Sequence, residues 1–198
     1  MGAIFQSLQR TLIAGVVLLV IIVALTTALS PANVAFGSHA WGAFVMRWLH
    51  VMFGVLWIGL LWYFNFVQMP SMPKIPDEQK PAISKVIAPT ALMWFRHAAL
   101  WTVITGLTLA AMNGYIVQAL TLHRPFTPIG IGMWLALVMA YNVWFIIWPN
   151  QQRALGIVQV DADTKAKSAR MAMMASRFNT MFSVPMLFCM VAQQNGGF

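Results

Sequence analysis

Long runs of apolar residues alternate with short polar segments along the whole chain. A helix that crosses a bilayer needs about 20 mostly apolar residues. The pattern predicts five such helices, at about residues 11–29, 41–69, 90–117, 129–149 and 171–193. The second segment is long enough to tilt or to project from the bilayer. We therefore expect a single all-α transmembrane domain over residues 1–198, built as a bundle of about five helices.

The polar segments differ sharply in charge, and this difference predicts an orientation. Basic residues gather before the first helix and in two loops, residues 70–85 and 150–170: Arg10, Lys74, Lys80, Lys85, Arg153, Lys165, Lys167 and Arg170. Residues 30–40 carry no Lys or Arg, and residues 118–128 carry only Arg124. Basic loops stay on the cytoplasmic side. The pattern predicts a multi-pass membrane protein, with its N-terminus cytoplasmic and its C-terminus outside.

Composition supports a protein whose main partner is the lipid bilayer. Hydrophobic residues make up 60% of the chain and charged residues 8%, whereas soluble domains carry about 25% charged residues. The net charge of +8 is explained by membrane orientation, so no nucleic-acid partner is expected. The single cysteine, Cys189, excludes an internal disulfide and a Cys-x-x-Cys-His haem attachment site. Its apolar neighbours indicate a small core residue.

Two histidines lie inside predicted membrane helices, where an ionisable residue indicates function. His50 shares a helix face with Gly54 and Trp57, and His97 shares one with Trp101. Histidine is a common haem ligand, a glycine lets a flat ligand approach the backbone, and tryptophans can stack on it. These residues are the candidate binding site for haem b, with His50 and His97 as candidate iron ligands.

Helix direction argues against one haem held by both histidines. The second helix enters from outside and the third from the cytoplasm, so each histidine lies near its own side of the membrane. A haem held by one histidine, or no haem at all, fits the sequence better. Each histidine can instead form a hydrogen bond to a neighbouring helix, and the tryptophans can serve packing alone. The many methionines are typical gap fillers and do not form a clear copper site.

Four motifs resemble the membrane domain of the bacterial urate hydroxylase family. They are "HVMFGVLWIGLLWYFNFVQ" at residues 50–68, "FRHAALWTVITGL" at 95–107, "NVWFIIWPNQQ" at 142–152 and "ASRFNTMFSVPMLFCM" at 175–190. The resemblance covers about residues 41–192, and "WPNQQ" is its most specific part. A shorter similarity, at the start of the second helix, links the chain to small haem-b membrane proteins of the protoporphyrinogen-oxidase type.

The resemblance implies a multi-helix membrane domain linked to urate oxidation. Family members carry a c-type cytochrome domain after this module, and the present sequence contains no Cys-x-x-Cys-His motif. We therefore expect electrons to pass to a separate c-type cytochrome. A planar urate anion would need charge-assisted and amide contacts, and Arg96, Asn150, Gln151 and Gln152 are expected on the same, cytoplasmic side. In a purely structural role, Arg96 would reach the interface and the amides would cap a helix end.

Two functions follow from these observations, and they belong to different classes. The first is a membrane-embedded redox protein of the urate hydroxylase type, an oxidoreductase that depends on a partner cytochrome. The second is a non-catalytic accessory subunit of a larger respiratory or oxidase complex. The buried histidines favour the first, and the short loops favour the second. A transporter is less consistent with the chain, because the five segments contain no internal repeat.

Overall fold

The computed structural model describes residues 2–29 and 35–196, and these residues form helices and connecting turns without any β-strand. The all-α class predicted from the sequence is therefore confirmed for this part of the chain. The chain divides into two compact units, Met1–Gly42 and Ala43–Phe198. The single transmembrane domain stays a prediction.

The first unit contains the short helix α1 (Gly2–Phe5) and the long helix α2 (Leu8–Leu29). The apolar run from Leu12 to Leu25 explains α2, because almost every position can face lipid. None of its residues is buried inside the protein. The helix begins three residues before the predicted start, and Thr11 Oγ1 donates hydrogen bonds to the carbonyls of Ile4 and Ser7.

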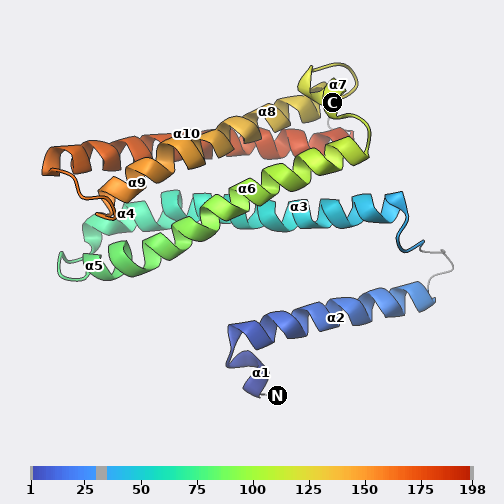
Figure 1. Cartoon of the computed structure of the whole chain (residues 1–198), viewed down its shortest axis with the longest axis horizontal. Helices are drawn as coiled ribbons and strands as arrows, with labels where there is room; N and C mark the ends of the chain where they lie inside the picture. Colours follow the sequence, from blue (N-terminus) through green and yellow to red (C-terminus); the bar gives the residue numbers. More distant parts are fainter. Residues whose placement is uncertain (1, 30–34, 197–198) are drawn as a thin grey trace. The chain divides into compact units, whose positions relative to one another are not determined.

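The second unit contains four long helical runs connected by short turns (Figure 1), and the first run begins just before the unit, at His39. The first combines α3 (His39–Trp62), the π-helix η1 (Tyr63–Gln68), α4 (Met69–Ser71) and the 3-10 turn η2 (Met72–Lys74). The second combines α5 (Lys80–Ala82), the π-helix η3 (Ile83–Ile87) and α6 (Ala88–Met112). The third, after the short helix α7 (Ile116–Leu120), combines α8 (Thr127–Tyr141), the π-helix η4 (Asn142–Ile147) and α9 (Trp148–Ala154). The fourth is α10 (Ala162–Asn195).

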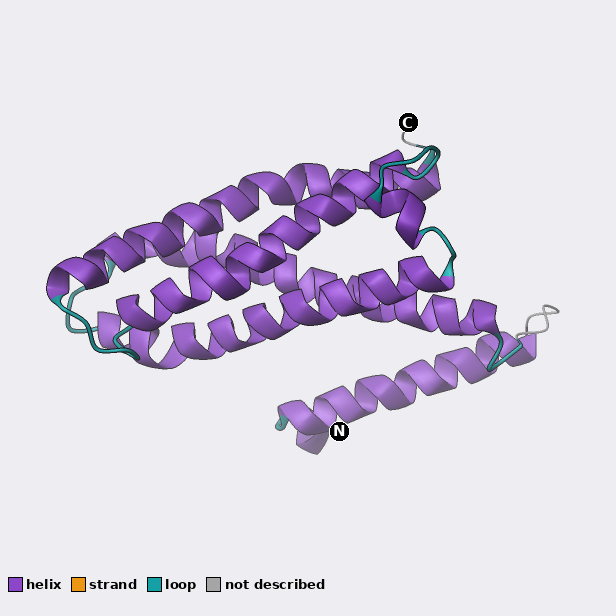
Figure 2. Ribbon diagram, turned by 45° about the horizontal axis from the view of Figure 1, so that its top comes forward, coloured by secondary structure: helices purple, strands orange, loops and turns teal. Residues whose placement is uncertain are grey.

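Successive runs of this unit point in alternating directions, so α3 is antiparallel to α6, and α8 is antiparallel to α10 (Figures 1 and 2). Aromatic and aliphatic side chains fill the space between the runs. The largest of those with almost no exposed surface are Trp57, Leu61, Phe95 and Met139. Helices α8 and α10 approach closely, because a Cβ at Gly132 would lie 3.0 Å from Cβ of Cys189. This contact agrees with the buried, apolar role expected for the cysteine.

Hydrogen bonds between side chains connect α10 to the other runs. Trp62 Nε1 donates to Ser183 Oγ at 3.0 Å, and Asn65 Nδ2 donates to Ser176 Oγ at 2.8 Å. Inside a membrane, helices gain little free energy from removing apolar surface from water. Polar contacts such as these, together with close packing, therefore stabilise the association of the helices. They also fix how far each helix is shifted along its neighbours.

The buried Asn179 makes a further contact of this kind between α10 and the α8–η4 run. Its Nδ2 donates to the Met139 carbonyl at 2.9 Å, and its Oδ1 accepts from Asn142 Nδ2 at 2.9 Å. Asn142 is the first residue of the π-helix η4. Departures of this kind from α-helical geometry are frequent at functional sites.

Three helical runs among the described residues are long and apolar enough to cross a membrane: Leu8–Leu29, His39–Lys74 and Thr127–Ala154. The remaining two long helices, α6 and α10, are of sufficient length but more polar. The first half of α10 holds Lys165, Lys167, Arg170 and Arg177, and α6 holds Arg96 and His97. The structure thus confirms helices able to span a membrane, while the five-span topology remains a prediction.

Two helix boundaries differ from the sequence prediction for local reasons. Helix α6 ends at Met112 rather than near residue 117, because Gly114 adopts φ +75° in the following turn. Helix α10 begins nine residues before position 171, at Ala162. Its N-cap, Asp161, accepts a hydrogen bond from the Thr164 amide at 2.8 Å. The Thr164 hydroxyl also donates to this carboxyl, and the hydroxyl and the amide together hold the pKa of the Asp161 carboxyl below its usual value.

The close packing of α7 against α8 requires a glycine at position 130, because there is no room for a side chain. A Cβ at Gly130 would lie 2.0 Å from the Ala119 carbonyl oxygen. We expect Gly130→Ala to lower the free energy of unfolding by about 1–3 kcal/mol, the usual cost of overpacking a core. Thermal unfolding in detergent measures this loss. Gly59→Ala is the matched control, because no atom lies within 4 Å of its added Cβ. Equal stability of the two variants would contradict the expectation.

Candidate functional site

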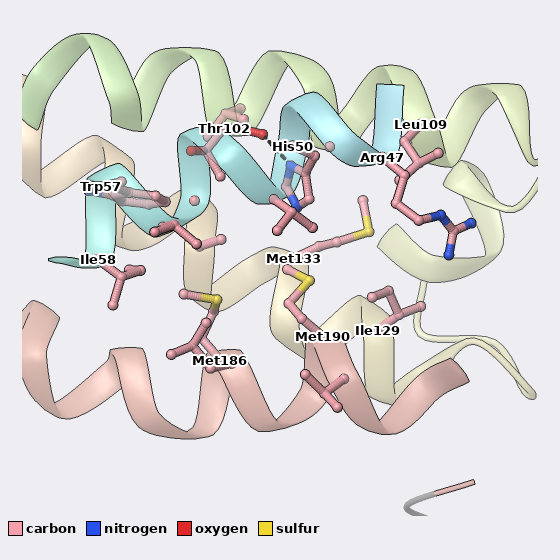
Figure 3. Close-up of a pocket in the computed structure, with 18 of the residues that line it drawn as sticks. Arg47, His50, Trp57, Ile58, Thr102, Leu109, Ile129, Met133, Met186 and Met190 are labelled. Atoms are coloured by element: carbon pink, nitrogen blue, oxygen red, sulfur yellow. Dashed lines mark hydrogen bonds between the residues drawn. The ribbon is translucent and has the colours of Figure 1, made fainter. Parts of the chain in front are cut away.

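A cavity of about 600 Å³, partly open to the surface past Val55 and Val191, lies in the second unit between α3, α6, α8 and α10 (Figure 3). Most of its wall is apolar, and the side chains include Trp57, Ile58, Leu109, Ile129, Met133, Ala136, Met186 and Met190. The polar side chains among the lining residues are few. Three of them matter for the chemistry: His50 on α3, Thr102 on α6 and Arg47 at one end. A large apolar cavity with a few convergent polar groups is typical of a small-molecule site.

His50 is held in one orientation by α6. Its Nδ1 lies 2.9 Å from the Thr102 carbonyl oxygen and 3.3 Å from Thr105 Oγ1. A carbonyl only accepts hydrogen bonds, so Nδ1 carries the proton. The Thr105 hydroxyl uses its own proton on the Trp101 carbonyl, at 2.6 Å, and therefore accepts from His50. In the neutral ring Nε2 then has a free lone pair, and Figure 3 shows it on the cavity side of the imidazole.

Gly106 makes the position of the His50 ring possible. A Cβ at Gly106 would lie 2.7 Å from Cε1 of His50 and 3.0 Å from Nδ1, closer than real Cβ contacts allow. The sequence had indicated Gly54 for close approach, yet a Cβ there would meet only Thr102 Cγ2 at 3.9 Å, an ordinary contact. Sequence reasoning thus missed Gly106. It stands within the "VITGL" segment of a quoted motif, but only the antiparallel pairing of α3 and α6 brings it to His50.

The cavity is polar at the Arg47 end. Arg47 donates a hydrogen bond from Nη1 to Oε1 of Gln194, near the end of α10. Tyr115, from the turn after α6, also lines the cavity. A cation therefore lies at one end of an otherwise apolar space.

The predicted cofactor-binding residues separate into two groups. His50, Gly54 and Trp57 line the large cavity, whereas His97 and Trp101 line a second pocket of about 320 Å³. His97 is exposed, and its Nδ1 lies 2.8 Å from the carbonyl of the residue one turn earlier in its own helix. Trp101 stacks on Phe53, with ring centroids 6.0 Å apart. The structure does not bring the two histidines to one site.

Trp57 is completely buried, and its Nε1 has no hydrogen-bond partner. An indole N–H left without an acceptor is unfavourable in an apolar interior. Of the two tryptophans expected to stack on a planar ligand, Trp57 is the one that reaches the large cavity.

The predicted substrate residues lie where α6 meets α9. Cζ of Arg96 is 3.3 Å from the ring centroid of Trp148, a close cation–π contact, and 5.9 Å from that of Trp144. Nε and Nη1 of Arg96 are buried without a hydrogen-bond acceptor. Asn150 Nδ2 donates to the Ile146 carbonyl of its own helical run at 2.8 Å. Gln151 and Gln152 are half-buried in α9. Arg96 is therefore held against the start of α9, with two donors unused.

Protein side chains alone offer no metal centre in the described ranges, since they contain no group of three or more His, Cys, Asp or Glu suited to an ion. A metal at His50 would have to arrive within a cofactor that supplies the other ligands.

Residues 124–196 match the urate oxidase N-terminal family. The matched segment runs from the turn before α8 to the end of α10, so it includes two of the four quoted motifs, at residues 142–152 and 175–190. The resemblance stated from the sequence is confirmed there. No curated protein and no solved structure matches the chain. The matched segment supplies Met133, Met186 and Met190 to the cavity wall, while His50 and Gly106 come from outside it.

The contact between Gly106 and His50 yields a direct test. ¹⁵N NMR of histidine-labelled protein in detergent should show His50 as the neutral tautomer protonated at Nδ1. Gly106→Ala should shift the two His50 nitrogen signals, because the added methyl displaces the ring from the Thr102 carbonyl. Gly54→Ala is the matched control and should leave them unchanged. Equal spectra for both variants would show that the ring does not rest against Gly106.

Proposed function

We propose that this chain is a membrane-embedded redox protein related to urate hydroxylase, which holds haem b on His50 and passes electrons to a separate c-type cytochrome. The observation that carries the proposal is the free Nε2 of His50 facing the cavity. Metal-binding histidines typically donate their other ring N–H to a carbonyl or carboxylate, which fixes the tautomer and the ring orientation. The hydrogen bond from His50 Nδ1 to the Thr102 carbonyl has this form.

The cavity suits haem in size and polarity as well. Its volume of about 600 Å³ lies within the range of about 300–1,000 Å³ that ligand pockets have. Its apolar walls match a porphyrin, and Arg47 at one end offers charge-assisted hydrogen bonds to carboxylates such as haem propionates. Haem would supply a one-electron redox centre in this place. His50 would hold it, Gly106 would leave room for the His50 imidazole, and the apolar walls would contact the porphyrin.

The family match of residues 124–196 supports urate as the substrate class. Hydroxylation of urate with oxygen from water releases two electrons and two protons. A one-electron centre would pass the electrons on singly, and a c-type cytochrome is a suitable acceptor. For urate itself we propose the region around Arg96, where two guanidinium nitrogens, Nε and Nη1, lack acceptors. An arginine fork binds planar anions in charge-assisted pairs, and Asn150, Gln151 and Gln152 follow in the adjacent helix α9.

We further propose a five-span topology in a bacterial inner membrane, with the N-terminus cytoplasmic. The three apolar runs that meet the length and composition of a membrane span support part of this arrangement. The basic residues of the loops support its direction. A non-catalytic subunit of a larger respiratory or oxidase complex is the alternative, in which His50 would only join α3 to α6. The two functions differ in whether the purified protein holds haem.

The first test of this proposal is an absorption spectrum of the protein purified in detergent. We expect a reduced-minus-oxidised band of the b type. His50→Ala should abolish the band, because it removes the only imidazole in the cavity wall. His97→Ala should keep it, since His97 lines another pocket. Elution as a single species in size-exclusion chromatography controls for folding. A b-type band that survives His50→Ala would assign the haem elsewhere, and a wild-type protein without haem would favour the accessory-subunit alternative.

The second test concerns Arg96 and uses urate consumption by membranes that contain the chain and a c-type cytochrome. A hydrogen bond to a charged group contributes about 1.5–3 kcal/mol, so Arg96→Gln should lower kcat/KM by roughly tenfold to a hundredfold. Arg153→Gln is the matched control, because Arg153 is exposed on α9. The haem spectrum of Arg96→Gln should be unchanged. If both variants consume urate like the wild type, urate does not bind at Arg96.

A further inference from the structure

Three methionines reach the cavity from the side opposite His50. Met133 comes from α8, and Met186 and Met190 come from α10 one turn apart. Figure 3 shows their thioether sulfurs among the side chains that point into the cavity. Met133 and Met186 are buried, with 8% and 4% of their surface exposed. One imidazole nitrogen thus faces a group of thioethers across an apolar space.

The register of the antiparallel helices α3 and α10 decides which of the two methionines of α10 lies level with His50. Three hydrogen-bonded pairs set this register: Arg47 with Gln194, Trp62 with Ser183, and Asn65 with Ser176. Each step forward on α3 therefore corresponds to about one step back on α10. His50 follows Arg47 by three residues, so it lies level with the part of α10 just before Gln194. Met190 is within one helical turn of that level.

The other two methionines are placed differently. Helix α8 is paired with α10 through the Ile129 amide, which donates to Gln193 Oε1 at 3.3 Å, and through the close approach of Gly132 to Cys189. Met133 therefore lies near the level of Met190, but on the neighbouring helix. Met186 is one turn farther from the Arg47 end, and it lies near Ile58 in Figure 3.

We propose that Met190 provides the second iron ligand, opposite His50, for the haem of the proposed function, on which this inference rests. A thioether is a soft ligand that iron accepts in haem proteins, and ligation by Met and His raises the reduction potential. A higher reduction potential makes a redox centre a better acceptor of electrons. Ligation by both His50 and Met190 would leave no open iron position for small molecules. The two residues would then suit a centre that transfers electrons rather than one that activates oxygen.

The experiment compares the wild-type protein with Met190→Leu, Met133→Leu and Met186→Leu, which conserve side-chain volume. The wild-type reduced haem should bind no carbon monoxide. Met190→Leu should bind it stoichiometrically, lose the thioether-to-iron charge-transfer band of the oxidised spectrum, and show a lower midpoint potential. Met133→Leu and Met186→Leu should behave like the wild type. Met190→His provides a second variant, in which the new imidazole should bind the iron in place of the thioether and again prevent carbon monoxide binding.

The outcomes separate this inference from the function on which it rests. Carbon monoxide binding by the wild type, or an unchanged Met190→Leu, would overturn Met190 ligation while the b-type band still supports haem on His50. Loss of the charge-transfer band in Met133→Leu or Met186→Leu, but not in Met190→Leu, would overturn it as well. A wild-type protein without any haem band would overturn both proposals together.

Discussion

The hydrogen bond between His50 Nδ1 and the Thr102 carbonyl fixes the chemistry of the cavity. It assigns the proton to one ring nitrogen and leaves the other free to act as a ligand. The bond is possible because Gly106 has no side chain, so the imidazole can rest on the backbone of α6. Thr105 completes the arrangement as a second acceptor at 3.3 Å. A single turn of α6 thus sets the orientation, the tautomer and the reach of His50.

The orientation of His50 matters for the cavity only because α10, which forms the opposite wall, is held at a fixed shift along the helical run that carries His50. In lipid the helices gain little from burying apolar surface, so their relative shifts depend on polar cross-links and on close packing at small residues. Trp62 with Ser183, and Asn65 with Ser176, set α10 against the first run. Asn65 lies in the π-helix η1 and also donates to the Leu61 carbonyl of its own run. The register that these contacts impose brings thioethers, rather than another polar group, to the level of His50.

The sequence predicted the helices well and the site only in part. Apolar runs predict helices directly, and an imidazole within such a run is unusual. The helices and the importance of His50 could therefore both be predicted from the sequence. The role of Gly106 was not, because helical periodicity relates residues within one helix and says nothing of which residues meet across two. The same limit applies to Gly54, chosen for its place on the His50 face. His97 looked equivalent to His50 in sequence, yet its Nδ1 meets its own helix and its ring lines another pocket.

The two ends of the cavity differ in a way that would orient a planar ligand. Arg47, Gln194 and Tyr115 line one end, and Trp57, Ile58 and Met186 line the other. Leaving a carboxylate unpaired in an apolar interior is costly, so an amphipathic ring would place its acidic edge toward Arg47. Haem b has such an edge, since its two propionates stand on one side of the macrocycle. The proposed iron ligand near the middle of the cavity and the cation at one end would then be complementary: His50 would hold the centre of the macrocycle, and Arg47 would set the direction of its propionate edge.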